Sequence, residues 1–348
     1  MSDSLPTETK QPSSKRKYVL LSAFVLLVAV GWSAFWYISY SRTQEIVNRL
    51  MARTVDGQQL LQCNEQTLGG YPFRLSLTCA SYRIQDPRSG WQAEGGPLRA
   101  IWQVYAPNLA VIETENRATL THQPTGQSFE MVANLMRGSV RFSPSAFVTR
   151  ASFEATEPTF ASNNPQLASL IGDIKAKAME FHLRPTPDQP ANLDVSLAAT
   201  DFASRALPDL SGQVSFTLVG GLEAVLHNQG NPARAWLEQS GKVNPLAGNI
   251  EIGQKTIKLS GDLAFDRLGM ANGLIKARIL NPPADQANPV QTLTAKKDGL
   301  NGPLTALQLM GKPMKDGDLI GSEVEIKLSN GQMKAGFIPL GTVPPLQF

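Results

Sequence analysis

An uncharged apolar stretch near the N-terminus constrains this chain more than any other feature. It runs from Val19 to Ile38 (V-L-L-S-A-F-V-L-L-V-A-V-G-W-S-A-F-W-Y-I), with basic residues from Lys15 to Lys17 before it and Arg42 after it. A helix of about 20 residues is long enough to cross the roughly 30 Å apolar core of a bilayer. The sequence therefore predicts a transmembrane helix over residues 18–40, with the lipid bilayer as its partner.

The basic flank predicts the orientation of this helix. Lys and Arg resist translocation, so the N-terminus is expected in the cytoplasm and the bulk of the chain in the periplasm. The rival interpretation is a cleaved signal peptide, which has an apolar core of about 7 to 15 residues. The run here is longer, and aromatic residues crowd its far end, as they do at a membrane interface (Trp32, Phe35, Trp36, Tyr37 and Tyr40). We therefore expect an uncleaved, single-pass anchor in the inner (cytoplasmic) membrane.

The chain divides into further regions around this anchor. Residues 1–17 have almost nothing apolar to bury and are predicted to be a disordered cytoplasmic tail. Residues 41–56 are predicted to be a helical linker, because their apolar residues fall on one side of a helix. Residues 57–348 are predicted to be an exported, β-rich domain. Three prolines within 185–190 either divide that domain or form a long turn within one sheet, and we favour the turn.

Composition narrows the class of the exported domain. Of the 348 residues, 42% are hydrophobic, which excludes wholesale disorder. The net charge is only +3, and no basic block lies outside the N-terminal tail. A patch that neutralises phosphates is therefore not expected, and nucleic acid is not an expected partner.

Short alternating segments separated by Gly, Pro, Asn and Asp dominate the region after Gly57. Such spacing favours antiparallel strands joined by tight turns. Typical segments are Phe73–Ile84, Ala110–Glu115, Ala118–His122 and Met270–Ile279. The predicted fold is mainly β: a transmembrane helix followed by one large, elongated, twisted antiparallel sheet with few short helices. The helices are expected over Pro232–Gln239, after Asn231, and over Pro289–Lys297.

Two hairpins of similar pattern are predicted in the second half. One spans Ile257–Ile279, where Gly261 and Gly273 leave gaps that a neighbouring element could approach. The other spans Val324–Gly341 and carries Asn330-Gly331, a dipeptide favoured in two-residue hairpin turns.

The two cysteines, Cys63 and Cys79, lie on the expected exported side, where disulfides persist. The segment between them contains a turn motif made of Gly69, Gly70, Tyr71, Pro72, Phe73 and Arg74. A hairpin centred near Tyr71 places the cysteines opposite one another, so we predict a structural disulfide rather than a redox or metal-binding pair. Arg74 is expected on the opposite side to Phe73, either in solvent or against lipid head groups.

The sequence contains no residue pattern typical of a catalytic site. The histidines His122, His182 and His227 are widely separated, and the chain has no nucleophile elbow, zinc-binding helix, phosphate loop or dinucleotide fingerprint. The sequence therefore gives no reason to expect an enzyme, a metal or another cofactor.

Several of these sequence features together resemble those of known protein families. The anchor helix, Cys63, G-G-Y-P-F-R, Cys79, V-Y-A-P-N (104–108) and the closing G-F-I-P-L-G-T-V-P-P-L (336–346) resemble an alphaproteobacterial envelope family known as domain of unknown function 2125. More weakly, L-S-G-D-L-A-F-D-R-L-G (259–269) resembles strand pairs of AsmA-type envelope proteins. That second resemblance implies long antiparallel sheets that form an apolar groove involved in lipid or outer-membrane handling.

Three functional hypotheses follow. In the first, an apolar groove of the sheet binds or guides lipid; candidate lining residues are Ala146–Val148, Leu193/Val195/Leu197 and Ile257/Leu259. In the second, a structural envelope protein with a closed core and no ligand binds another envelope protein. The third, a hydrolase of envelope polymers, needs paired carboxylates that the sequence does not indicate. A long continuous apolar groove supports the first hypothesis, and a filled interior supports the second.

Overall fold

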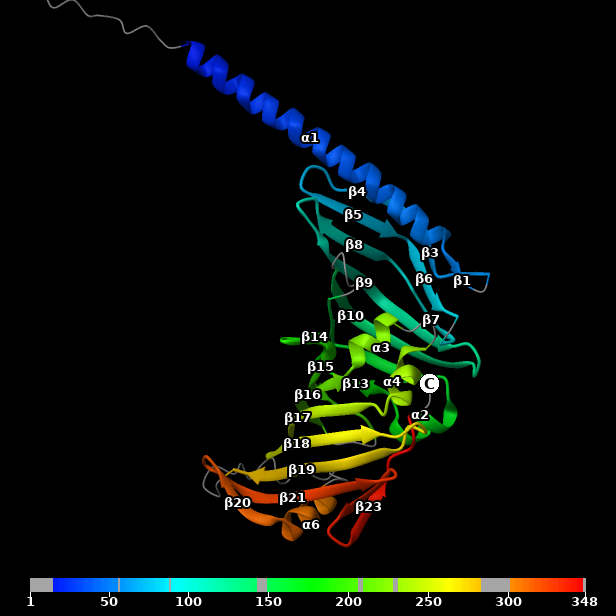
Figure 1. The fold of residues 1–348 in the computed structure, drawn as a ribbon, viewed down its shortest axis with the longest axis vertical. Helices are drawn as coiled ribbons and strands as arrows, with labels where there is room; N and C mark the ends of the chain where they lie inside the picture. Colours follow the sequence, from blue (N-terminus) through cyan, green and yellow to red (C-terminus); the bar gives the residue numbers. More distant parts are fainter. Residues whose placement is uncertain are drawn as a thin grey trace, which may run out of the picture.

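The computed structural model of the chain describes residues 15–55, 57–87, 89–142, 149–205, 209–227, 231–282 and 301–346. It consists of one long helix, α1, one large antiparallel sheet and a few short helices (Figure 1). The predicted fold class is therefore confirmed.

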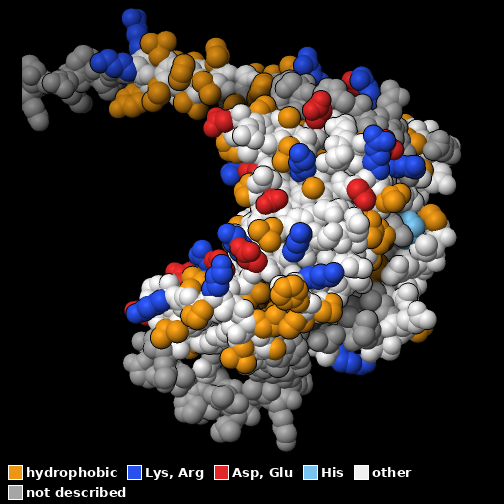
Figure 2. All heavy atoms as spheres, turned by 60° about the horizontal axis from the view of Figure 1, so that its bottom comes forward, with side chains coloured by type: hydrophobic (Ala, Val, Ile, Leu, Met, Phe, Trp, Pro, Cys, Tyr) orange, Lys and Arg blue, Asp and Glu red, His pale blue; other side chains and the backbone are white. Residues whose placement is uncertain are grey.

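Helix α1 (Lys15–Ala52) is a continuous helix of 38 residues. Its first half projects from the sheet domain as a rod covered by apolar side chains, with basic side chains at the outer end (Figure 2). The helix is long and apolar enough to cross a membrane or to act as a signal sequence. One predicted boundary differs from the structure: residues 15–17 belong to the helix, since Lys and Arg are good helix formers. The predicted linker 41–56 is helical as far as Ala52, where it continues the same helix, and strand β1 follows it. Residues 1–14 lie outside the described part of the chain.

The strands follow the chain order with short connections. They are β1 (Thr54–Val55), β2 (Gln58–Gln59), β3 (Leu61–Asn64), β4 (Thr67–Gly69), β5 (Arg74–Cys79), β6 (Ser81–Asp86), β7 (Trp91–Gly95), β8 (Leu98–Gln103), β9 (Ala106–His122), β10 (Gln127–Arg141), β11 (Arg150–Thr156), β12 (Thr159–Ser162), β13 (Ile174–Lys175), β14 (Ala178–Thr186), β15 (Gln189–Phe202), β16 (Leu210–Val219), β17 (Lys242–Ile252), β18 (Lys255–Phe265), β19 (Ala271–Asn281), β20 (Lys312–Asp316), β21 (Leu319–Ser329), β22 (Gln332–Ala335) and β23 (Ile338–Thr342).

Antiparallel pairing connects these strands into one sheet, apart from the small β1–β2 pair. At one end of the sheet, β4 pairs with β5 and β3 pairs with β6. Strand β5 also pairs with β8, and β6 also pairs with β7. Both β7 and β8 then pair with β9. From β9 the order continues through β10, β11, β14, β15, β16, β17, β18, β19, β21, β22 and β23. Figure 1 shows β4 and β23 at opposite ends of the domain, and the sheet twists between them.

Within the described residues, short helices accompany the sheet: α2 (Pro165–Ile171), α3 (Gly221–His227), α4 (Pro232–Glu238) and α6 (Asn301–Met310). Helix α4 was predicted, and its N-cap is Asn231, whose side-chain oxygen accepts hydrogen bonds from the N–H groups of Ala233 and Arg234. The helix predicted over Pro289–Lys297 lies outside the described residues.

Some predicted strand boundaries differ from the observed ones. The strand predicted over Phe73–Ile84 is interrupted at Ala80, between β5 and β6. The two strands predicted over Ala110–Glu115 and Ala118–His122 are parts of the single strand β9, since pairing with β10 on one side bridges the intervening polar residues. The proline-rich residues 185–190 contain the turn between β14 and β15, and the sheet continues across it.

Candidate functional site

The most extensive feature of the sheet is a row of apolar residues that crosses almost all of it. Register partners follow one another from β5 to β22, and each position in the row is apolar or glycine. In sheet order the row is Leu75, Trp102, Ala110, Val140, Ala151, Leu183, Val195, Phe216, Leu246, Gly261, Ile275, Ile326 and Ala335. Neighbouring strands are about 4.8 Å apart, so the row extends for roughly 55 Å.

A second row lies beside the first on the same face, because alternate residues of a strand point to the same side. It consists of Leu77, Ala100, Ile112, Gly138, Phe153, Phe181, Leu197, Val214, Gly248, Leu259, Ala277 and Val324. We call the surface formed by these two rows the apolar face. Of the predicted lining residues, it includes Val195 and Leu197 on β15 and Leu259 on β18. Leu193 and Ile257 lie outside the two rows but on the same side of the sheet, two residues along these strands.

Much of the apolar face is only partly covered. Phe153, Phe181 and Val214 are half-buried, and Leu197 retains 45% of its accessible surface. An ordinary core position on a sheet of this size is packed under another layer. The middle of the apolar face is therefore partly accessible to solvent.

Two helices border the apolar face over β16–β21. On one side Trp236 of α4 packs with Val243 and Leu263, and its indole N–H donates a hydrogen bond to the carbonyl oxygen of Val219 at 2.9 Å. On the other side α6 is joined to β21, where the hydroxyl of Ser322 donates to the carbonyl oxygen of Gln308 at 2.6 Å. Phe216 and Leu246 of the longer row pack against the cluster that contains Trp236.

Beneath α3 and α4 the apolar face deepens into a pocket of about 470 Å³. Its lining is entirely apolar and comes from α3, α4, β16–β18 and the C-terminal segment: Phe216, Leu218, Val225, Pro232, Ala233, Trp236, Val243, Leu246, Leu263, Phe265 and Leu346. The volume lies within the range of about 300 to 1,000 Å³ typical of small-molecule sites. Because the lining presents no polar side chain, the pocket suits a hydrocarbon group.

The opposite face of the sheet is polar and carries ion pairs between neighbouring strands. Arg137 on β10 contacts Glu113 on β9 at 3.0 Å and Glu154 on β11 at 3.3 Å. Arg278 on β19 contacts Glu323 on β21 at 2.9 Å, and this hydrogen bond lowers the pKa of the Glu323 carboxyl. Figure 2 shows acidic and basic side chains side by side on the surface of the domain. One face of the sheet is thus apolar, and the other is polar.

Asp194 belongs to this polar face, beside a hollow lined by Arg150, His182 and Arg184. Burial opposes ionisation of Asp194, but hydrogen bonds from Thr186 and Thr217 and the nearby Arg184 outweigh it and lower the pKa of the carboxyl. The hollow therefore contains an ion pair between Arg184 and Asp194, at 3.4 Å.

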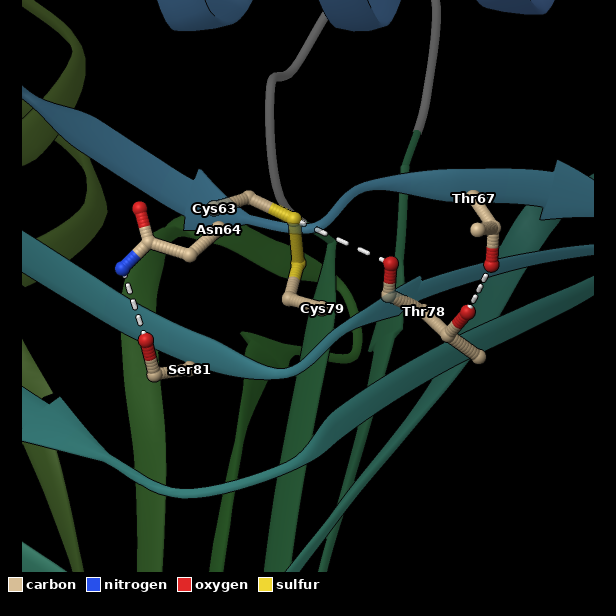
Figure 3. The surroundings of a disulfide bond; sticks show 6 residues. All are labelled: Cys63, Asn64, Thr67, Thr78, Cys79 and Ser81. Atoms are coloured by element: carbon tan, nitrogen blue, oxygen red, sulfur yellow. Dashed lines mark hydrogen bonds between the residues drawn. A yellow bond between two sulfur atoms is a disulfide. The ribbon is translucent and has the colours of Figure 1, made fainter.

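Cys63 and Cys79 form a disulfide, with their Cα atoms 5.2 Å apart (Figure 3). The predicted hairpin placed the two cysteines opposite one another, but they are not register partners. Cys63 lies opposite Tyr82, and Cys79 lies opposite Leu98. The hairpin bends between β3 and β4, where Glu65 has a positive φ. The disulfide joins the ends of β3 and β5 at this bend.

The predicted turn motif connects β4 to β5 and packs against α1. The indole N–H of Trp32 donates to the carbonyl oxygen of Pro72 at 2.9 Å, and that of Trp36 donates to the carbonyl oxygen of Arg74 at 3.1 Å. Gly70 has a φ of +112°, which favours glycine. Gly69 lies at the end of β4, and a Cβ added there would meet no atom within 4 Å. The sequence identified this turn but not its helical partner.

The remaining predicted polar residues do not come together. His122 bonds the Thr125 hydroxyl at 2.8 Å on one turn, and His182 lies between Ser152 and Glu180 on the polar face. The side chain of His227 and the stretch Ala146–Val148 lie outside the described residues. Among the described residues, no three His, Cys, Asp or Glu side chains are grouped so that they could hold a metal ion.

Residues 36–344 match the model of the family described as "Uncharacterized protein conserved in bacteria (DUF2125)". The chain belongs to this family. No curated protein and no solved structure matches it. The match covers the sheet domain and the end of the apolar run of α1, so Cys63, G-G-Y-P-F-R, Cys79, V-Y-A-P-N and most of the closing motif are parts of one DUF2125 domain.

Two of those features meet in space. G-G-Y-P-F-R forms the β4–β5 turn, and V-Y-A-P-N forms the β8–β9 turn beside it, where the N–H of Val104 donates to the carbonyl oxygen of Phe73 at 3.1 Å. The third, G-F-I-P-L-G, forms the β22–β23 hairpin at the far end of the sheet. In this DUF2125 chain the apolar face connects the two ends.

Proposed function

We propose that this protein is a single-pass inner-membrane protein whose periplasmic sheet binds lipid acyl chains on its apolar face. The observation that carries the proposal is the pair of apolar rows, which run unbroken by any polar residue from β5, beside α1, to β21 and β22. Large, partly exposed apolar surfaces on exported domains are typical of binding sites.

Binding on this face requires no catalytic residue. Each CH₂ group removed from water contributes about 0.8 kcal/mol, so an acyl chain lying along part of a row gains several kilocalories per mole. The protein acts in this proposal by sheltering hydrocarbon, and the pocket beneath α4 holds the end of a chain. The resemblance of residues 259–269 to AsmA-type strand pairs supports the same function.

The contacts of α1 support an anchor over a cleaved signal peptide. Trp32 and Trp36 lie within the apolar run and donate hydrogen bonds to the β4–β5 turn. Removal of this run would take away two partners of the folded domain. The basic residues at the start of α1 favour a cytoplasmic N-terminus.

The test compares lipid bound to the full-length chain and to two single variants, purified in mild detergent under oxidising conditions. Leu197→Asp places a charge on the apolar face, and Ser196→Asp places the same charge on the polar face one residue away. Leu197 is exposed enough to accept the change without loss of the fold.

Native mass spectrometry with lipid extraction is expected to detect lipid on the wild type and on Ser196→Asp, and much less on Leu197→Asp. Lipid held around α1 affects all three proteins equally. Equal lipid on all three proteins would contradict binding on the apolar face and would favour the alternative, a structural envelope protein that binds a protein partner there.

A further inference from the structure

Three aromatic side chains stand out on two neighbouring turns of the sheet domain. Tyr71 and Phe73 in the β4–β5 turn are 59% and 61% exposed, and Tyr105 in the β8–β9 turn is 62% exposed. The turns lie side by side because Arg74 is the register partner of Gln103. They form one aromatic cluster, which we call the turn cluster (Tyr71, Phe73 and Tyr105).

Helix α1 fixes the position of the turn cluster along the membrane normal. Tyr71 packs edge-on against Trp36 with ring centroids 5.3 Å apart, and Phe73 packs against Trp32 at 5.7 Å. The Tyr71 hydroxyl also forms a hydrogen bond with the Ser33 hydroxyl at 2.8 Å. These helix residues precede Ile38, the last residue of the apolar run, by two to six positions, or roughly 3 to 9 Å at 1.5 Å per residue.

The side chains of the turn cluster are of the types that suit a position near the end of the apolar run of α1. Tyrosine and tryptophan prefer the layer between lipid head groups and acyl chains, since their rings are apolar and their polar atoms form hydrogen bonds there. Arg74 lies in the same turn with an exposed side chain that forms no ion pair among the described residues. A guanidinium at this level is suited to a lipid phosphate.

We propose that the turn cluster inserts into the head-group layer of the periplasmic leaflet, so that the apolar face begins inside the membrane interface. Phe73 directly precedes β5, and Leu75, two residues further on, is the first member of the longer apolar row. Leu75 itself is buried, and its register partner Trp102 is half-buried. An acyl chain leaving the bilayer beside α1 therefore first meets the row at Trp102. This inference deepens the proposed function and rests on α1 as a membrane anchor.

The test measures the depth of a probe in the full-length chain. Because both native cysteines are in the disulfide, a cysteine introduced by Tyr105→Cys is labelled selectively with an NBD fluorophore in the absence of reductant. The matched control is Phe337→Cys, since Phe337 is fully exposed in the turn between β22 and β23 at the other end of the sheet. Both proteins are reconstituted in phosphatidylcholine–phosphatidylglycerol vesicles that contain lipids spin-labelled near the head group.

The probe at position 105 is expected to emit at shorter wavelength and to be quenched by the spin-labelled lipid, and the probe at 337 to be quenched only by aqueous iodide. A second probe introduced by Phe73→Cys is expected to match position 105. Unchanged circular dichroism spectra establish that each variant folds.

Iodide quenching without lipid quenching at positions 105 and 73 would overturn the insertion. That result leaves lipid binding on the apolar face unaffected, as measured with Leu197→Asp. Lipid quenching at both positions, in a protein whose apolar face carries no lipid, would support the insertion and contradict the proposed function. The two claims therefore fail separately.

Discussion

Gly261 on β18 lies directly opposite Ile275 on β19, and the two backbones approach so closely that a side chain at Gly261 has no room. A Cβ there would lie 2.2 Å from the carbonyl oxygen of Leu274. The predicted gap at Gly261 is thus used by the neighbouring strand itself, not by a separate element.

Replacement of Gly261 by alanine is expected to destabilise the sheet by about 1 to 3 kcal/mol, because backbone atoms must move to relieve the contact. Chemical denaturation in detergent measures the change. The control is Gly96→Ala, where the nearest atom to the added Cβ is 4.0 Å away. Equal stability of the two variants would contradict the close approach.

The disulfide is expected to stabilise the hairpin beside α1. Loss of a cross-link between residues 16 apart costs about 3 kcal/mol in the chain-entropy model. The double variant Cys63→Ser/Cys79→Ser should therefore unfold at a lower urea concentration than the wild type. Reductant should lower the midpoint of the wild type but not that of the double variant; a midpoint insensitive to reductant in both would mean that the disulfide is absent.

Low pH should destabilise the folded protein by protonating the Asp194 carboxylate on the polar face. The pKa of this carboxyl is lower in the folded chain than its ordinary value of about 3.9, so its stabilising contribution is complete above that value and is lost as the pH falls through the folded pKa. Asp194→Asn is expected to reduce the thermal midpoint at pH 7 and to matter progressively less below about pH 4. A variant as damaging at pH 3 as at pH 7 would show that the ionised carboxyl is not the stabilising species.

The anchor should remain attached to the mature protein. Trp32 and Trp36 are partners of the β4–β5 turn, and cleavage within or after the apolar run would separate them from it. An epitope tag at the N-terminus is expected on the full-size chain in membranes washed with carbonate. A mature chain that begins after Tyr40 would establish a signal peptide instead.

Local patterns in the sequence predict the elements of this fold well. The apolar run, the Asn231 cap and the Asn330-Gly331 turn each depend on neighbouring residues, and the structure contains all three, the last with positive φ at both turn residues. Strand ends were less predictable, since pairing across the sheet extends β9 through polar residues such as Asn116, which lies opposite Ala133 on β10.

The apolar face was only partly predictable for the same reason. Alternation within β15 indicates that Val195 and Leu197 share a face, but alternation within one strand does not determine the register with the next. Only pairing places Leu197 between Phe181 and Val214 and so joins separate strands into a row. The docking of the turn motif on Trp32 likewise depends on a contact between residues 40 positions apart.

The central claim, that lipid lies on the apolar face, is tested most directly by photo-cross-linking in intact membranes. The photoreactive residue benzoylphenylalanine is placed at Leu197 and Leu259 on the apolar face, and at their neighbours Ser196 and Ser260 on the polar face. Mass spectrometry of the irradiated full-length chain is expected to find phospholipid adducts at positions 197 and 259 and not at 196 or 260. Adducts to protein alone at 197 and 259, or the same lipid yield at all four positions, would contradict the account.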